Sequence, residues 1–165
     1  MKKQLLVLVL LFCLQAPVLR AQTAACIKVE GEVTTPLTLC AEEFAKMKHT
    51  EAIMKDRDGK EYRYSGVPVS EILKQAGATV GKDLRGENLS KYLLVKAADG
   101  YEVLFSLAEL DSTFTDRVVI LADQLEGKPL PAGKGPFRII VPGEKKPARC
   151  AFEVTRLIVR FSSEH

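Results

Sequence analysis

Histidine is scarce in this sequence, which contains only His49 and His165. His49 follows a short predicted helix and has Lys46 and Lys48 as neighbours, so we expect it to lie on the surface. A Ser-His-Asp triad or a Cys-His pair would have to use this residue, and its neighbours favour neither. A zinc site needs three or four Cys and His ligands at suitable spacing, which the chain does not offer.

Sequence motifs of nucleotide-binding and acid–base catalytic sites are also missing. The sequence has no glycine-rich loop of the Walker or Rossmann kind, and its spaced glycines mark turns. Internal repeats and low-complexity segments are absent. Adjacent acids occur at Glu42-Glu43 and from Glu109 to Asp111. Because neighbouring side chains on a short helix point in different directions, we expect these acids to be solvated rather than to form a catalytic pair.

The long apolar run from Leu5 to Leu14 is too short to span a membrane, which takes roughly 20 residues. With Lys2 and Lys3 before it, the run predicts an export signal that ends at Ala21. A lipoprotein signal ending at Cys26 is the alternative. Soluble export is preferred because that second motif lacks its first aliphatic residue. We therefore expect a periplasmic or secreted protein.

Once the signal is removed, the chain has no excess of positive or negative charge. Residues 1–21 carry Lys2, Lys3 and Arg20 and no acid, so the formal charge falls from +3 to about zero. Nucleic-acid binding favours a clustered basic face, which a near-neutral chain with interspersed charges does not predict. The remaining residues, 22–165, suit one domain in length. A hydrophobic content of 47% argues against disorder.

Three cysteines follow the predicted signal, namely Cys26, Cys40 and Cys150. An oxidising compartment allows one disulfide among them and leaves one thiol over. All three pairings stay open at this point. A Cys26–Cys40 bridge would close a short loop and contribute around 3 kcal/mol to stability. A redox role for one of the thiols is a further alternative.

Hydrophobic periodicity and turn residues predict a mixed α+β fold with many strands and two short helices. We expect strands at 27–33, 37–39, 118–122, 137–141 and 152–161, and helices at 41–47 and 69–76. Hairpins are expected at 50–64, around Asp58-Gly59, and at 92–107, around Asp99-Gly100. The segment Gly66-Val67-Pro68 is expected to end the first hairpin and to open the second helix, since proline is tolerated at a helix start.

Basic residues gather near the C-terminus. Arg138 follows a glycine-rich loop, and Lys145, Lys146 and Arg149 follow the turn at Pro142-Gly143. If the intervening strand brings both loops to one end, these cations and the loop amides form a site for an anion. The alternative is that the lysines are solubilising charges of a turn.

Four blocks of sequence occur in an order that is more specific than any one of them. The blocks are Tyr64-Ser65-Gly66-Val67-Pro68-Val69 with Ala76-Gly77, Ala98-Asp99-Gly100-Tyr101 with Phe105-Ser106-Leu107-Ala108-Glu109-Leu110, Gly127-Lys128-Pro129-Leu130 with Gly135-Pro136-Phe137-Arg138-Ile139-Ile140-Val141-Pro142-Gly143, and Val154-Thr155-Arg156-Leu157. The ordered set resembles the sulfite-oxidase-like molybdopterin-binding domain family, close to its short, exported, stand-alone members. This resemblance implies an α+β domain with mixed β-sheet and a few short helices over residues 22–165.

The resemblance also implies a cofactor, because larger relatives bind molybdopterin and oxidise or reduce small oxo-compounds. In those enzymes a cysteine thiolate just before the Gly-Val-Pro helix ligates the metal. The corresponding segment here, Ile53–Gly59, contains no cysteine. A histidine of the family is replaced within Gly133-Lys134-Gly135, and a family tryptophan is missing because the chain has no Trp. The cofactor-contacting positions that remain are Arg138, Lys145, Lys146 and Arg149.

Three functions are compatible with these observations. The missing thiolate favours a non-catalytic module that binds a small anionic ligand or a protein partner, with no metal ligand and no catalytic residue assigned. A molybdopterin-dependent oxidoreductase, or a subunit of one, is the first alternative. A thiol-redox protein is the second. The sequence leaves open whether the protein is an enzyme.

Overall fold

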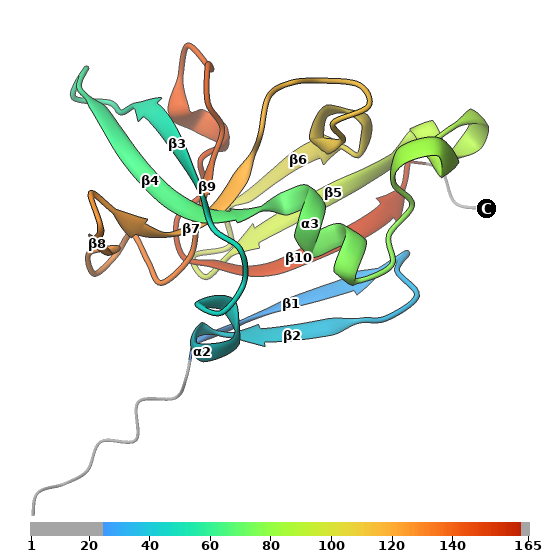
Figure 1. Ribbon diagram of the computed structural model, residues 1–165, viewed down its shortest axis with the longest axis horizontal. Coiled ribbons are helices and arrows are strands. Elements are labelled where there is room, and N and C mark those ends of the chain that lie inside the picture. Colours follow the sequence, from blue (N-terminus) through green and yellow to red (C-terminus); the bar gives the residue numbers. More distant parts are fainter. Residues whose placement is uncertain (1–24, 163–165) are drawn as a thin grey trace, which may run out of the picture.

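Short strands dominate the computed structural model, which describes residues 25–162 (Figure 1). The strands are β1 (Cys26–Gly31), β2 (Leu37–Cys40), β3 (Thr50–Lys55), β4 (Glu61–Pro68), β5 (Lys91–Ala97), β6 (Glu102–Ser106), β7 (Ile120–Leu125), β8 (Lys128–Pro129), β9 (Arg138–Ile140) and β10 (Val154–Phe161). The helical segments are α2 (Ala41–Phe44), α3 (Val69–Gln75), η1 (Gly81–Asp83), η2 (Gly86–Ser90), η3 (Ala108–Leu110) and η4 (Pro147–Arg149). The predicted export signal and His165 lie outside the described residues.

Two sheets form the body of the protein. The first has the order β2-β1-β10-β5-β6, and the second has the order β3-β4-β7-β8, with β9 also paired to β7. Strands β1 and β10 run parallel, whereas the other pairs are antiparallel. One cluster of buried apolar side chains draws on both sheets and on α3. The predicted α+β fold with mixed sheet is confirmed. Within residues 25–162, no helix is long and apolar enough to cross a membrane.

Both predicted hairpins are present, and each turns at the expected glycine. Strands β3 and β4 pair from Thr50↔Gly66 to Lys55↔Glu61, with Gly59 at φ +81° in the turn. Strands β5 and β6 pair on either side of Gly100, whose φ is +85°. Left-handed backbone favours glycine because it has no Cβ, so the two Asp-Gly pairs mark the turns correctly.

Gly66 does not end the first hairpin as predicted. Strand β4 continues through Pro68 and pairs with β7, from Gly66↔Ala122 to Pro68↔Ile120. A Cβ at Gly66 would lie 2.1 Å from the carbonyl oxygen of Leu121. The residue is therefore a point of close approach between two strands, and its lack of a side chain permits the pairing.

The predicted second helix is present as α3, which begins directly after Pro68 and buries an apolar stripe of Val69, Ile72 and Leu73. Gly77 follows its end at φ +71°, as expected for a helix stop. The helix predicted at 41–47 is shorter, because α2 ends at Phe44. Beyond it, Met47 N–H donates to the Phe44 carbonyl, three residues back, so the chain tightens into a turn.

The disulfide joins Cys26 and Cys40, one of the three pairings that the sequence left open. These residues face each other across β1 and β2, with their Cα atoms 3.9 Å apart. The bridge ties β2, and with it the start of α2, to the first sheet. Among the described cysteines this leaves Cys150 as the free thiol, and it is buried.

Candidate functional site

Arg138 is the charged side chain that the fold buries most completely, with 1% of its surface exposed. It lies on β9, which pairs with β7 at Ala122. Its Nη1 donates to the hydroxyl of Tyr64 (2.6 Å) and lies 3.3 Å from Oδ2 of Asp56. The guanidinium plane also lies over two rings, 4.1 Å from the centroid of Phe152 and 5.2 Å from that of Tyr64. Aromatic faces attract a guanidinium, so three neighbouring residues, Tyr64, Asp56 and Phe152, fix this side chain.

The ionisation of this cluster follows from the same contacts. Burial by itself raises the pKa of Asp56, but the Arg57 backbone N–H and the charge of Arg138 outweigh it and leave the pKa below its ordinary value. Burial raises the pKa of Tyr64 to about 12. At neutral pH the cluster is therefore an ion pair beside a neutral phenol. The positive charge of Arg138 is already balanced by a carboxylate.

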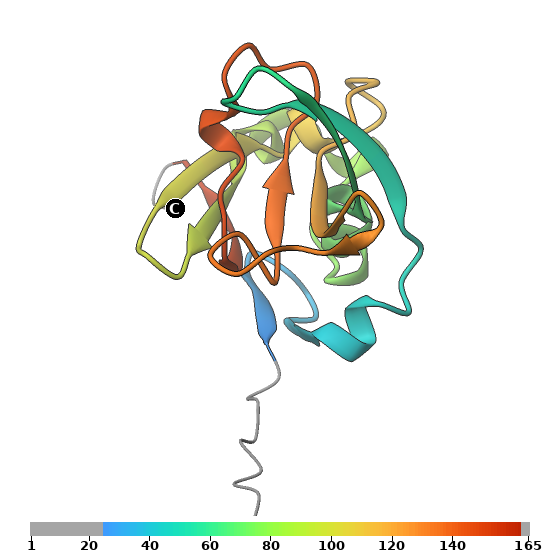
Figure 2. The ribbon, with the colours of Figure 1, turned by 90° about the vertical axis from the view of Figure 1, so that its left-hand side faces the viewer.

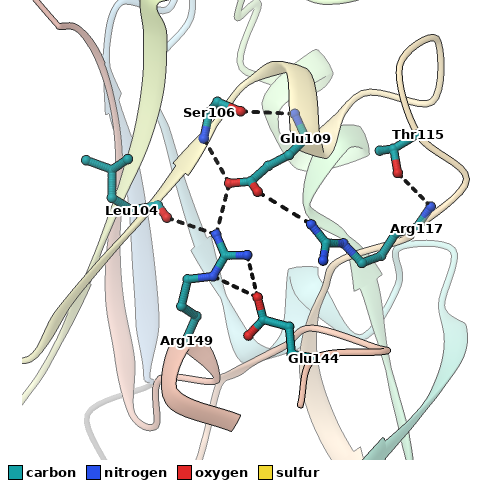
Figure 3. Close-up of polar contacts among 7 residues, drawn as sticks. All are labelled: Leu104, Ser106, Glu109, Thr115, Arg117, Glu144 and Arg149. Atoms are coloured by element: carbon teal, nitrogen blue, oxygen red, sulfur yellow. Dashed lines mark hydrogen bonds and ion pairs between the residues drawn. The ribbon is translucent and has the colours of Figure 1, made fainter. Parts of the chain in front are cut away.

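Arg149 is engaged in a second cluster, which Figure 3 shows. Its Nη1 lies 3.0 Å from Oε1 of Glu109, its Nε donates to Glu144 (2.8 Å), and its Nη2 contacts the same carboxylate. The guanidinium lies 4.5 Å from the ring centroid of Phe105. Burial lowers the pKa of Arg149, and the two carboxylates raise it by more. Arg149 is therefore a structural cation held between two acids.

The same cluster covers the free edge of β6. The Leu107 N–H donates to the Lys91 carbonyl, and the Tyr101 carbonyl accepts from the Ala97 N–H. The backbone N–H and C=O groups of the odd-numbered residues in β6 therefore point toward β5. The backbone groups of the even-numbered residues point away from β5, toward the open edge of the sheet. Arg149 donates to the carbonyl of Leu104 (3.3 Å), and the N–H of Ser106 donates to Glu109 (3.0 Å) (Figure 3). Two side chains thus occupy backbone groups that an incoming strand would use.

Lys145 and Lys146 are exposed, and their side chains make no hydrogen bond or ion pair within residues 25–162. The loop before β9 and the turn at Pro142-Gly143 lie at opposite ends of that strand (Figure 2). The condition for a joint anion site, both loops at one end, is therefore not met. The role of Arg138, Lys145, Lys146 and Arg149 in cofactor binding stays a prediction.

Cys150 brings its sulfur to the segment that the resemblance associates with the metal ligand. Its Sγ lies 3.1 Å from Sδ of Met54 and accepts a hydrogen bond from the Val141 N–H (3.4 Å). The residue is 2% exposed. Burial raises the pKa of its thiol, and the nearby Val141 N–H and Arg138 offset this only in part. The sulfur is therefore a protonated thiol without an open face toward solvent.

His49 was expected on the surface, and this is wrong. Its side chain is 18% exposed. Its Nδ1 lies 2.8 Å from the carbonyl oxygen of Met47, and its Nε2 lies 3.1 Å from Oδ1 of Asp123. The ring packs edge-on against Phe44, with centroids 5.5 Å apart. Asp123 lies 74 positions away, so no local sequence signal reveals the pair.

The acids of η3 are also not solvated as expected. Glu109 joins the Arg149 cluster and also accepts from Nη2 of Arg117 (3.4 Å). Asp111 is buried and accepts from the Gly81 N–H (2.5 Å) and from the hydroxyl of Thr113 (2.7 Å). The two carboxylates serve separate clusters, and both stabilise loops.

A pocket of about 830 Å³ lies apart from these clusters. It is formed by α3, the end of β4 and the segment between α2 and β3. The residues lining it are Met47, Lys48, His49, Thr50, Val67, Pro68, Glu71, Lys74 and Gln75. None of the four predicted cofactor-contacting residues lines it.

Comparison with known proteins identifies the fold and the family. Residues 57–151 match the family described as the oxidoreductase molybdopterin binding domain. The chain belongs to this family. A solved structure, the sulfane dehydrogenase SoxCD from Paracoccus pantotrophus, is 21% identical with a TM-score of 0.63. The match covers 85% of this chain and 39% of that one, so this chain spans about two fifths of its length. No curated protein matches the chain.

The residues of this molybdopterin-binding domain do not fit a metal held by a protein thiolate. Such ligation needs a deprotonated and accessible sulfur. Cys26 and Cys40 are joined in the disulfide, and the Cys150 thiol is buried with a raised pKa. Across residues 25–162, no group of three His, Cys, Asp or Glu side chains is arranged to hold a metal ion. Nothing in the site therefore reproduces the thiolate centre that the family resemblance implies.

Proposed function

We propose that this protein is an exported, non-catalytic member of the molybdopterin-binding domain family, which binds a small anionic ligand or a protein partner. The observation that carries the proposal is the state of Cys150. This thiol reaches Met54, in the segment before Gly66-Val67-Pro68, yet it is 2% exposed and its pKa is raised. A thiol in that state is a poor metal ligand and a poor nucleophile.

The side-chain clusters around Arg138 and Arg149 support the same proposal. A pterin or an oxyanion substrate needs free cationic donors. Arg138 is paired with Asp56 and enclosed by aromatic rings, and Arg149 is paired with Glu109 and Glu144. Releasing either arginine would leave buried or half-buried carboxylates without a partner, which is costly. The scaffold is thus stabilised by residues that a cofactor would otherwise use.

Export is supported by the signal-like start of the sequence and by the bridge between Cys26 and Cys40. Disulfides persist in oxidising compartments and are rare in reducing ones. We place the mature protein, residues 22–165, in the periplasm or outside the cell. The Cys26–Cys40 bridge also makes a lipid attached at Cys26 incompatible with this structure, since the sulfur is already bonded.

The test is metal and pterin analysis of the full chain, expressed in a host that makes molybdenum cofactor and exports through the native signal. We expect no molybdenum and no pterin bound in proportion to protein. A parallel thiol assay should find no reaction in the folded protein and one reactive thiol per mature chain after unfolding, with Cys150→Ala as the silent control. Stoichiometric molybdenum, or a rapidly reacting Cys150 in the folded protein, would favour the oxidoreductase and overturn the proposal.

A further inference from the structure

The pocket between α3 and the α2–β3 segment has the size of a small-molecule site. Its volume of about 830 Å³ falls within the range of roughly 300–1,000 Å³ that is typical of such sites. Pro68 and Met47 are half-buried and supply an apolar surface to the pocket, whereas Val67 is only 1% exposed. Thr50 and Gln75 add a hydroxyl and an amide, which can orient a bound molecule.

His49 fixes one wall of this pocket. Both of its ring nitrogens face acceptors, the carbonyl oxygen of Met47 at 2.8 Å and the carboxylate of Asp123 at 3.1 Å. The ring also rests edge-on against the buried Phe44. These contacts anchor the α2–β3 segment, which carries Lys48 and Thr50, to strand β7.

The pocket has an excess of positive charge at its rim. Lys48 and Lys74 are exposed, and the side chain of neither makes an ion pair or hydrogen bond within the described part of the chain. Glu71 is the acidic side chain of the lining. Asp123 is not part of the lining, and its Oδ1 lies 3.1 Å from Nε2 of His49. An apolar floor with two available ammonium groups is complementary to an organic anion.

We infer that this pocket binds a small carboxylate with an apolar body, held by Lys48 and Lys74 over the surface of Met47 and Pro68. The inference deepens the proposed binding function, on which it rests, by naming a site and a ligand class. It also moves the anion site away from the basic turn at Lys145 and Lys146. His49 is a positioning residue in this site, because both of its ring nitrogens lie against acceptors within the protein.

The experiment is a titration of the isotopically labelled mature protein, followed by two-dimensional NMR, with benzoate, octanoate and indole-3-acetate. Benzylamine and benzamide serve as cationic and neutral probes of similar size to benzoate. We expect the carboxylates to shift the resonances of the lining residues in a saturable way. Lys48→Gln and Lys74→Gln should each weaken binding about two- to fivefold, as for the loss of one exposed charge interaction.

The matched control is Lys46→Gln, which removes an exposed lysine from the same stretch of chain but outside the pocket lining. This variant should bind like the wild type. The inference is overturned if none of the carboxylates shifts the lining residues, if benzylamine binds as tightly as benzoate, or if Lys46→Gln weakens binding as much as Lys74→Gln. These outcomes are separate from the metal analysis, because bound molybdenum would contradict the non-catalytic function and leave the pocket result unchanged.

Discussion

Arg138 and Asp56 form the most buried ion pair among the described residues, with 1% and 12% of their side chains exposed. Replacing one partner of a buried pair leaves the other without compensation for lost hydration. We expect Arg138→Met to lower the free energy of unfolding by about 3–5 kcal/mol at neutral pH. Arg63→Met is the matched control, because Arg63 pairs with Glu51 at the exposed surface. It should cost no more than about 1 kcal/mol in urea denaturation.

The pH dependence of this effect separates charge pairing from lost packing. The pKa of Asp56 is lower in the folded protein than in the unfolded chain, so its contribution is present above the unfolded value near 4. It is lost as the pH falls through the lower folded value. The stability difference between wild type and Arg138→Met should therefore shrink below about pH 4. A difference that stays constant on acidification would mean that packing against Phe152 and Tyr64 accounts for the whole effect.

At the scale of single elements, β6 is the edge of the first sheet and carries the exposed side chain of Leu104. Arg149 and Glu109 occupy the backbone carbonyl of Leu104 and the N–H of Ser106. Unpaired edge groups next to an apolar side chain favour pairing with another chain. The Arg149 cluster therefore protects this edge, whatever else Arg149 binds.

We expect Arg149→Ala to make the protein self-associate at concentrations where the wild type does not. The substitution frees the Leu104 carbonyl and leaves Glu109 and Glu144 without their shared cation. Sedimentation velocity over a concentration series measures the effect. Lys145→Ala is the matched control, because Lys145 is an exposed cation of the neighbouring turn, and it should sediment like the wild type. If Arg149→Ala and Lys145→Ala sediment alike, the Arg149 cluster does not protect the edge of β6 from self-association.

At the scale of the whole molecule, the Cys26–Cys40 bridge fastens β2 and the start of α2 to the sheet. It closes a loop with a sequence separation of 14 residues. The chain-entropy estimate for such a loop is about 3 kcal/mol. We expect Cys26→Ala/Cys40→Ala to lose roughly that amount of unfolding free energy. A thiol reductant should lower the stability of the wild type equally and leave the double variant unchanged. Equal stability of both proteins before reduction would contradict the estimate.

The family and the fold class were predictable because their signals are local and ordered. The two Asp-Gly turns lie between strands that are adjacent in sequence, so each hairpin is encoded within about 15 residues. The stripe of Val69, Ile72 and Leu73 likewise needs only the helical period. The lack of a cysteine in Ile53–Gly59 is visible without coordinates.

Gly66 and the acids of η3 show where local patterns failed. In the sequence, Gly66 looks like the end of a strand. In the structure, its role is set by the backbone of Leu121, which passes beside it. Asp111 looks like a solvated acid, whereas Gly81 and Thr113 bond to it in a buried position. Each outcome depends on a partner at least two residues away in the sequence. Hydrophobic periodicity does not show where that partner lies.

By itself, the sequence determined the family, the α+β class and the absence of a cysteine from Ile53–Gly59, because order, period and residue identity are properties of the chain. Tertiary structure alone decided which cysteines pair, that Cys150 lies against Met54, and that His49 faces Asp123. It also decided that Arg138 pairs with Asp56, whereas Arg149 pairs with Glu109 and Glu144. These contacts depend on how strands and loops are placed in the folded chain, so no local pattern of the sequence specifies them.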